Sequence, residues 1–105
     1  MNKTFASLGI NASLVEALTN QHITEPTAVQ EQAVPAALKG HNLLVQAQTG
    51  TGKTLAFLLP IFQGIKKDAS MTQALIMAPT RELSEQLATV AAYFTTVTGL
   101  DILKL

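Results

Sequence analysis

Two short apolar runs, each followed by a turn and a helical pattern, constrain the fold of this chain more than any other feature. The first spans 43–45 and leads through a glycine-containing turn into an apolar helix ending near Lys67. The second spans 74–78 and precedes a helix that should end just before Gly99. Such short apolar runs are typical of buried strands. A third run opens at Asp101, so the order strand, helix, strand, helix, strand predicts an α/β fold with a parallel sheet.

Helix start and stop signals predict two further helices before the first apolar run. Asn11 can cap a helix with one apolar face. Thr27 follows a proline and opens a second helix, which should run to about Lys39 and stop at Gly40. Pro35 inside that helix should kink it or tighten its geometry.

Composition limits the classes of protein that fit. The chain has 105 residues, 48% of them hydrophobic, so it forms one domain at most and can build a packed core. Only 13% are charged, against ~25% in a typical globular protein, which suits a piece whose faces are covered by more protein. Seven basic and seven acidic residues give no net charge, so charge alone does not support nucleic-acid binding.

Several kinds of site and location are disfavoured. The chain has no cysteine, which excludes disulfides and thiolate metal sites. His22 and His41 show no metal-ligand pattern. No signal-like run follows the start, and the longest apolar stretch, 55–62, is too short to cross a bilayer. We therefore expect a cytoplasmic protein without a membrane partner.

The strongest chemical signal is the run from Gly50 to Thr54, which lies between a predicted strand and a predicted helix. Glycines let backbone N–H groups approach a polyphosphate, and the following helix presents its positive dipole end to the same anion. Lys53 can reach the β and γ phosphates, and the Thr54 hydroxyl can coordinate Mg²⁺. The plain alternative is a glycine-rich turn with a surface lysine.

Three stretches together resemble the DEAD-box family of ATP-dependent RNA helicases. The first is the phosphate loop, where Ala47 matches the family form A-x-T-G-x-G-K-T. The second, Pro26 to Gln30, resembles the end of the family's Q motif, with Phe5 at the place of its upstream aromatic residue. The third, Pro79 to Leu83, resembles a motif that contacts RNA. The Q motif departs from the family where glycine and an aromatic residue give way to His22 and Ile23, and where Ala28 replaces a proline.

The resemblance implies a partial RecA-like P-loop domain with a parallel sheet flanked by helices, covering 1–105, with the Q-motif region in 1–40 and the phosphate-loop and RNA-contact region in 41–105. It implies ATP and Mg²⁺ as cofactors, RNA and a second RecA-like domain as partners, and an ATP-hydrolysing helicase as the parent protein. The implied nucleotide-binding residues are Phe5, Gln30, Ala47, Gln48, Thr49, Gly50, Thr51, Gly52, Lys53 and Thr54. Lys53 and Thr54 are the implied catalytic residues, and Pro79, Thr80, Arg81 and Glu82 the implied RNA contacts.

Two of these assignments have a structural alternative. A glutamine can pair with the N6 and N7 edge of adenine, but Gln30 also completes a capping box with Thr27. Phe5 can stack on a base or serve as a core aromatic residue. At the third motif, Thr80 and Glu82 also suit an ordinary helix start.

The family's D-E-A-D sequence does not occur in the chain. We therefore expect this chain to bind nucleotide without turning it over, and an incomplete sheet to favour self-association or domain swapping. Two rival hypotheses are a nucleotide-responsive binding module and another P-loop enzyme, such as a DNA helicase or a kinase.

Overall fold

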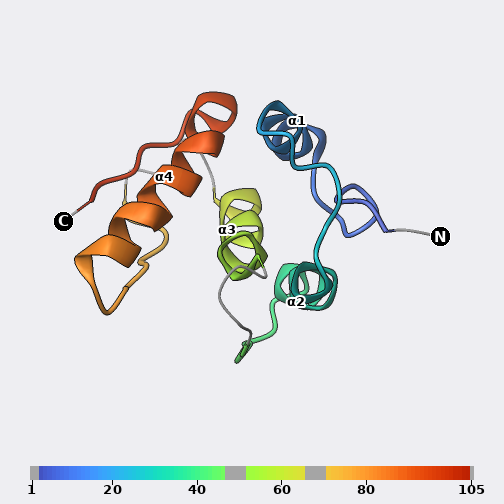
Figure 1. The fold of residues 1–105 in the computed structure, drawn as a ribbon, viewed down its shortest axis with the longest axis horizontal. Helices are drawn as coiled ribbons and strands as arrows, with labels where there is room; N and C mark the ends of the chain where they lie inside the picture. Colours follow the sequence, from blue (N-terminus) through green and yellow to red (C-terminus); the bar gives the residue numbers. More distant parts are fainter. Residues whose placement is uncertain (1–2, 47–51, 66–70, 105) are drawn as a thin grey trace.

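A computed structural model describes residues 3–46, 52–65 and 71–104. In these ranges the chain forms four α-helices: α1 (Ala12–Asn20), α2 (Ala28–Leu38), α3 (Lys53–Gly64) and α4 (Arg81–Thr98). Figure 1 shows α3 between α2 and α4, with α1 beside the upper end of α4. Helix α3 packs against both α2 and α4, and α1 packs against α4.

Helices α1, α2 and α4 begin at the predicted caps, and α2 and α4 end at the predicted glycines. The Leu14 N–H donates to Asn11 Oδ1 over 3.0 Å at the start of α1. At the ends of α2 and α4, Gly40 and Gly99 adopt φ angles of 88° and 70°. Glycine reaches this left-handed region without steric cost, so both stops are confirmed. Helix α2 continues through Pro35.

Helix α1 ends in a left-handed residue that is not glycine. His22 has a φ of 62°, and its N–H donates to the Thr19 carbonyl over 2.9 Å. The next N–H, of Ile23, donates to the Leu18 carbonyl over 2.9 Å. These two bonds form a Schellman motif, whose left-handed position favours glycine. The motif gives a backbone reason for a glycine at this position of the Q motif.

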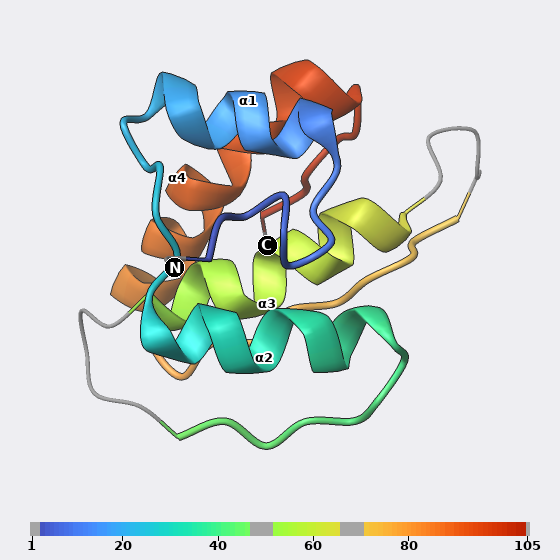
Figure 2. The same ribbon diagram turned by 90° about the vertical axis from the view of Figure 1, so that its right-hand side faces the viewer.

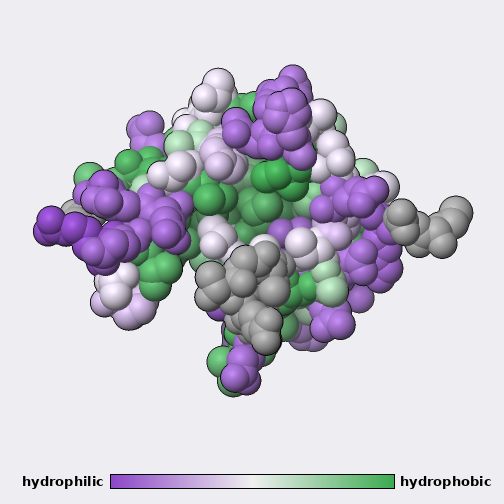
Figure 3. All heavy atoms as spheres, in the orientation of Figure 1, coloured by the Kyte–Doolittle hydropathy of each residue, from purple (hydrophilic) through white to green (hydrophobic). Residues whose placement is uncertain are grey.

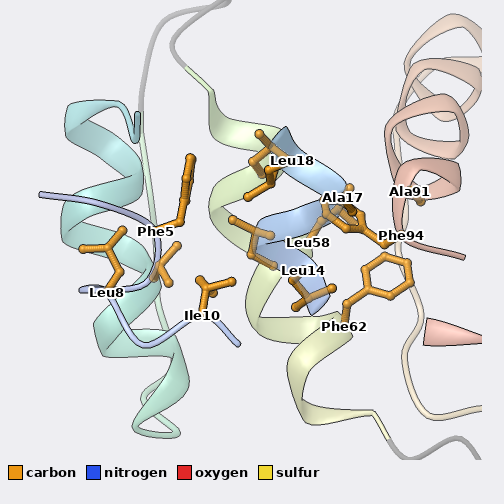
Figure 4. Close-up of a cluster of buried hydrophobic side chains, with 13 residues drawn as sticks. Phe5, Leu8, Ile10, Leu14, Ala17, Leu18, Leu58, Phe62, Ala91 and Phe94 are labelled. Atoms are coloured by element: carbon orange, nitrogen blue, oxygen red, sulfur yellow. The ribbon is translucent and has the colours of Figure 1, made fainter. Parts of the chain in front are cut away.

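The hydrophobic core lies between the four helices and the residues that precede α1. The rings of Phe62 and Phe94 pack with their centroids 5.2 Å apart and their planes tilted by 42°. Figure 4 shows the buried side chains of the core in a single cluster that extends from α2 across α3 to α4. Its buried members are Phe5, Leu8, Ile10, Leu14, Ala17, Leu18, Val34, Leu55, Leu58, Leu59, Phe62, Ala91 and Phe94.

The predicted sheet is not formed in the described residues. Segments 43–45, 74–78 and 101–104 are neither helix nor strand, and Leu105 lies outside the described residues. A strand needs a hydrogen-bonded neighbour, and the extended segments before α3 and before α4 do not run side by side in either view (Figures 1 and 2). Their apolar side chains are exposed, as Leu44 at 101% and Met77 at 83% illustrate. The pairing of these runs into a parallel sheet stays a prediction.

A smaller difference concerns the length of α3. Helix α3 ends at Gly64, earlier than the predicted end near Lys67, because Ile65 has an extended backbone with ψ of 141°. Lys67 itself lies outside the described residues. Within the described ranges, no helix combines the length and apolar character needed to cross a membrane.

The left-handed turn after α1 can be tested by substitution at His22. A β-branched residue is strained at positive φ, so His22→Val should lower the free energy of unfolding by about 1–2 kcal/mol. His22→Gly should stay within about 1 kcal/mol of the wild type, because relief of strain offsets the greater freedom of the unfolded chain. Urea denaturation of the three proteins measures both effects. Equal stability of the valine variant and the wild type would refute this account of the turn.

Candidate functional site

The phosphate-loop sequence leads directly into α3. Gly52 is the N-cap of α3 with φ of 88° and ψ of 21°, and no side chain caps the first turn. The first N–H groups of a helix lack partners within the helix, so this end can donate to an anion. Lys53, the first residue of α3, is exposed, and Thr54 is half-buried. Five further predicted residues lie outside the described residues: Ala47, Gln48, Thr49, Gly50 and Thr51.

Gln30 connects the Q-motif region to the phosphate loop. Its side chain is only 2% exposed. Gln30 Oε1 accepts from the Thr27 N–H over 2.9 Å, and Gln30 Nε2 donates to the Gly52 carbonyl over 3.1 Å. Thr27 Oγ1 in turn accepts from the Gln30 N–H over 3.4 Å, which completes the predicted capping box. Two motifs that lie 22 residues apart in the sequence are therefore hydrogen-bonded to each other.

The capping and bridging bonds leave part of the Gln30 amide's capacity for other partners. A glutamine amide has two N–H donors and two acceptor lone pairs. The two bonds above use one of each. Among the described residues, one donor and one acceptor of the amide remain, which is the set that pairs with the N6 and N7 edge of adenine. The Gln30 side chain is buried, so pairing with a base requires the amide to be uncovered, and adenine reading stays a prediction.

Gly52 fits closely against the two Q-motif side chains. A Cβ built at Gly52 would lie 2.5 Å from Gln30 Nε2 and 2.9 Å from Thr27 Oγ1. Both distances are shorter than van der Waals contact allows. Its positive φ also disfavours any side chain at this position. Glycine is thus required here by the backbone angle and by the approach of Gln30.

Phe5 lies in the hydrophobic core. Its ring is 2% exposed and belongs to the same cluster as Leu14 and Leu58. This is the arrangement that the core interpretation of the sequence describes. A base could stack on the ring only if the ring were first uncovered, so base stacking by Phe5 stays a prediction.

The third motif forms the exposed start of α4. Thr80 is the N-cap, and its Oγ1 accepts from the Leu83 N–H over 3.2 Å. Arg81 and Glu82 are exposed in the first turn, as is Pro79 before it. The helix-start reading is confirmed by this cap. The exposed side chains and the helix end remain open to a phosphate backbone.

A cleft of about 680 Å³ brings the first and third motifs together, and sequence reasoning did not anticipate it. Lys53 and Thr54 line it from α3, and Pro79 lines it just before α4. Its other walls are mainly apolar side chains from the extended segments 43–45 and 76–78 and from the facing sides of α3 and α4. Figure 3 shows hydrophobic side chains at the surface in the middle of the face on which α3 lies between α2 and α4. The cleft depends on segments distant in sequence, so no local pattern could reveal it.

The described residues contain no group of three or more His, Asp or Glu side chains placed to hold a metal ion.

Comparison with known proteins gives consistent matches. The family model described as DEAD/DEAH box helicase matches residues 27–104. The chain is 47% identical to the ATP-dependent RNA helicase DBP9 of Coccidioides immitis, over 97% of this chain and 18% of that protein. It is 40% identical to a probable ATP-dependent RNA helicase of Mycoplasma pneumoniae, over all of this chain and 24% of that protein. The chain thus spans about a fifth of the length of these curated relatives.

Solved structures show the same relationship in three dimensions. The RNA helicase Prp28 from Chaetomium thermophilum, bound to ADP, superposes with a TM-score of 0.88 at 35% identity, over 96% of this chain and 26% of that one. The Dbp5 protein of S. cerevisiae, bound to RNA and ADP BeF3, gives a TM-score of 0.81 at 32% identity, over 90% of this chain and 25% of that one.

The close approach at Gly52 is testable with a matched pair of glycine substitutions. Gly52→Ala places a methyl group against Gln30 Nε2 at positive φ, so it should lower the free energy of unfolding by about 1–2 kcal/mol and displace the Gln30 amide. Gly64→Ala, at the other end of α3, adds a Cβ in open space and should be neutral or stabilise by up to ~1 kcal/mol. Thermal denaturation measures the change in stability of each variant, and the side-chain amide NMR signals of Gln30 report the displacement of that amide. Similar behaviour of the two variants would contradict the contact.

Proposed function

Because the chain belongs to the DEAD/DEAH box helicase family, we propose that it is the ATP-binding part of an RNA helicase that couples ATP binding and hydrolysis to the unwinding or remodelling of RNA duplexes. The observation that supports this most directly is the hydrogen bond from the buried Gln30 to the Gly52 carbonyl. It places a side chain able to read adenine against the end of a loop suited to phosphates.

In this proposal the phosphates bind at the start of α3. The uncapped first turn donates N–H groups, and Lys53 supplies positive charge at the same helix end. The loop residues from Ala47 to Thr51 complete the cradle. Thr54 supplies a hydroxyl to Mg²⁺, which neutralises phosphate charge when bound. Lys53 and Thr54 are thus the residues of this chain that take part in catalysis.

RNA binding is assigned to the exposed start of α4. Pro79, Thr80, Arg81 and Glu82 lie at a helix N-terminus, where backbone N–H groups and the Arg81 guanidinium can meet a phosphate backbone. Glu82 has no favourable interaction with phosphate, so we assign it to stabilising the first turn. Pro79 lines the same cleft as Lys53, which supports an RNA surface next to the nucleotide site.

Turnover is assigned to the protein of which this chain forms a part. The relatives are about four to six times as long as the region matched here. Phosphoryl transfer needs a carboxylate that anchors the metal and cations that stabilise the developing charge. We propose that these groups come from the rest of the protein, including a second RecA-like domain, and that this chain alone binds nucleotide without hydrolysing it.

Adenine selectivity is the decisive property for this proposal. Calorimetric titration with Mg²⁺ should show tighter binding of ADP than of GDP, with the preference lost in Gln30→Ala. A bidentate pair contributes about 1–3 kcal/mol of discrimination, so the preference should be at least about fivefold. Gln32→Ala, which changes an exposed glutamine two residues away on α2, should keep it. Lys53→Ala should weaken both nucleotides equally.

Since Gln30 also caps α2, each variant must first be shown to fold by circular dichroism. Equal binding of ADP and GDP by the wild type would instead favour another P-loop enzyme. Failure of the folded wild type to bind either nucleotide would refute the proposed function.

We also propose that the chain associates with a second copy of itself through its extended segments. Residues 43–45 and 75–77 expose apolar side chains, among them Leu44 and Met77. Exposed extended segments of this kind readily pair with another chain. The zero net charge offers no long-range repulsion against such pairing.

Light scattering should therefore show a molecular mass that rises with concentration above that of the monomer. Leu44→Lys should shift the equilibrium toward monomer, because a charge at an exposed extended position opposes edge pairing. A concentration-independent monomer mass in the wild type would exclude this association.

A further inference from the structure

The N-terminal segment, defined here as residues 4–11, is a folded element with its own hydrogen bonds. The Thr4 N–H donates to Ser7 Oγ over 2.9 Å, and the Ser7 N–H donates to Thr4 Oγ1 over 3.1 Å. One helical turn follows and ends at Gly9, whose φ is 104°, with the Ile10 N–H donating to the Phe5 carbonyl over 3.2 Å. The segment therefore has hydrogen bonds of its own in addition to its contacts with the helices.

Gln63 in the last turn of α3 binds the backbone of this segment at two points. Gln63 Nε2 donates to the Gly9 carbonyl over 2.6 Å, and Gln63 Oε1 accepts from the Asn11 N–H over 2.8 Å. A carbonyl and an N–H two residues apart are the groups that a neighbouring strand would engage. The Gln63 amide takes the place of such a strand. Since Asn11 caps α1, the same contact ties the start of α1 to the end of α3.

Held in this way, the segment packs into the space between α2 and α3. Phe5 is 2% exposed and Ile10 is 4% exposed. Figure 4 shows both side chains between the ribbons of these two helices. On the α2 side, a Cβ built at Gly9 would lie 3.1 Å from Leu38 Cδ1, so the fit leaves little space. The segment therefore acts as a wedge that sets the spacing of α2 and α3.

The spacing of these two helices matters for the nucleotide site. Helix α2 carries Gln30, and α3 begins directly after Gly52. The bond of 3.1 Å between Gln30 Nε2 and the Gly52 carbonyl tolerates little relative movement of the two helices. We propose that Gln63 is a positioning residue for adenine recognition: it secures the wedge that keeps Gln30 in register with the phosphate loop. This rests on the nucleotide-binding function proposed above.

The role predicts a loss that falls on the base and spares the phosphates. Gln63→Met keeps the length of the side chain and removes both hydrogen bonds, while Gln32→Met makes the same change at an exposed position on α2. In Gln63→Met, the Asn11 amide should exchange faster with solvent, and the affinity for ADP with Mg²⁺ should fall about three- to tenfold. The affinity for inorganic pyrophosphate should stay within about twofold, because the start of α3 is unchanged. Gln32→Met should match the wild type in all three measurements.

Each alternative result gives a definite answer. Parallel losses for ADP and pyrophosphate would reveal a general loss of folded protein and overturn the positioning role. If the Asn11 amide exchanges faster but the affinity for ADP is unchanged, the positioning role is likewise overturned. If the exchange rate of the Asn11 amide is unchanged, the Gln63 contact does not hold the segment. A wild type that binds neither ligand would overturn the proposed function itself, and the positioning role with it. If Gln63→Met does not fold, Gln63→Glu serves in its place: it keeps the acceptor for the Asn11 N–H but sets a carboxylate oxygen against the Gly9 carbonyl, so the readout is then the fall in ADP affinity relative to that of pyrophosphate.

Discussion

Burial of α3 is the interaction on which the rest of this structure depends. Its Leu58 and Leu59 are at most 1% exposed, and Phe62 packs against Phe94 of α4. Each large apolar side chain removed from water contributes roughly 1.5–3 kcal/mol, so this helix carries much of the core. Because α3 also begins at the phosphate loop, the hydrophobic core and the candidate site share one element. Any force that shifts the helix in the core also moves Lys53.

Polar contacts then orient α3 at both of its ends. At the first end the Gln30 amide bonds the Gly52 carbonyl, and at the last end the Gln63 amide bonds the backbone of residues 9–11. Apolar packing is not directional, so it can bury a helix without defining its rotation or axial position. Hydrogen bonds have narrow distance and angle requirements and add that definition. The hydrogen bonds of Gln30 and Gln63 thus restrict the rotation and the axial position of α3, which apolar packing alone leaves undefined.

The extended segments that line the cleft leave apolar side chains exposed. Residues 43–45 and 76–78 line the cleft beside Lys53 and Pro79 with side chains that a complete sheet would cover. The low fraction of charged residues, 13%, agrees with faces meant to be covered by protein. The proposed self-association and the proposed nucleotide site therefore draw on neighbouring parts of the same surface.

The sequence by itself determined the family of this protein and the caps at which three of its helices begin and two of them end. Caps at Asn11, Thr27 and Thr80 and stops at Gly40 and Gly99 involve groups within a few residues of one another, so a local pattern contains all the information they need. The three motifs identified the family in the same way, because residue types at fixed spacing can be matched without coordinates.

Only the tertiary structure decided what those elements contact. The apolar runs at 43–45 and 74–78 have the composition of strands, yet a strand exists only when another segment lies beside it, and in the described residues none does. The burial of Phe5, the bond from Gln30 to Gly52 and the bonds of Gln63, which reach back 52 and 54 residues, depend on segments that meet only after folding. Pairing, burial and long-range hydrogen bonds are properties of two partners, whereas a sequence pattern describes one.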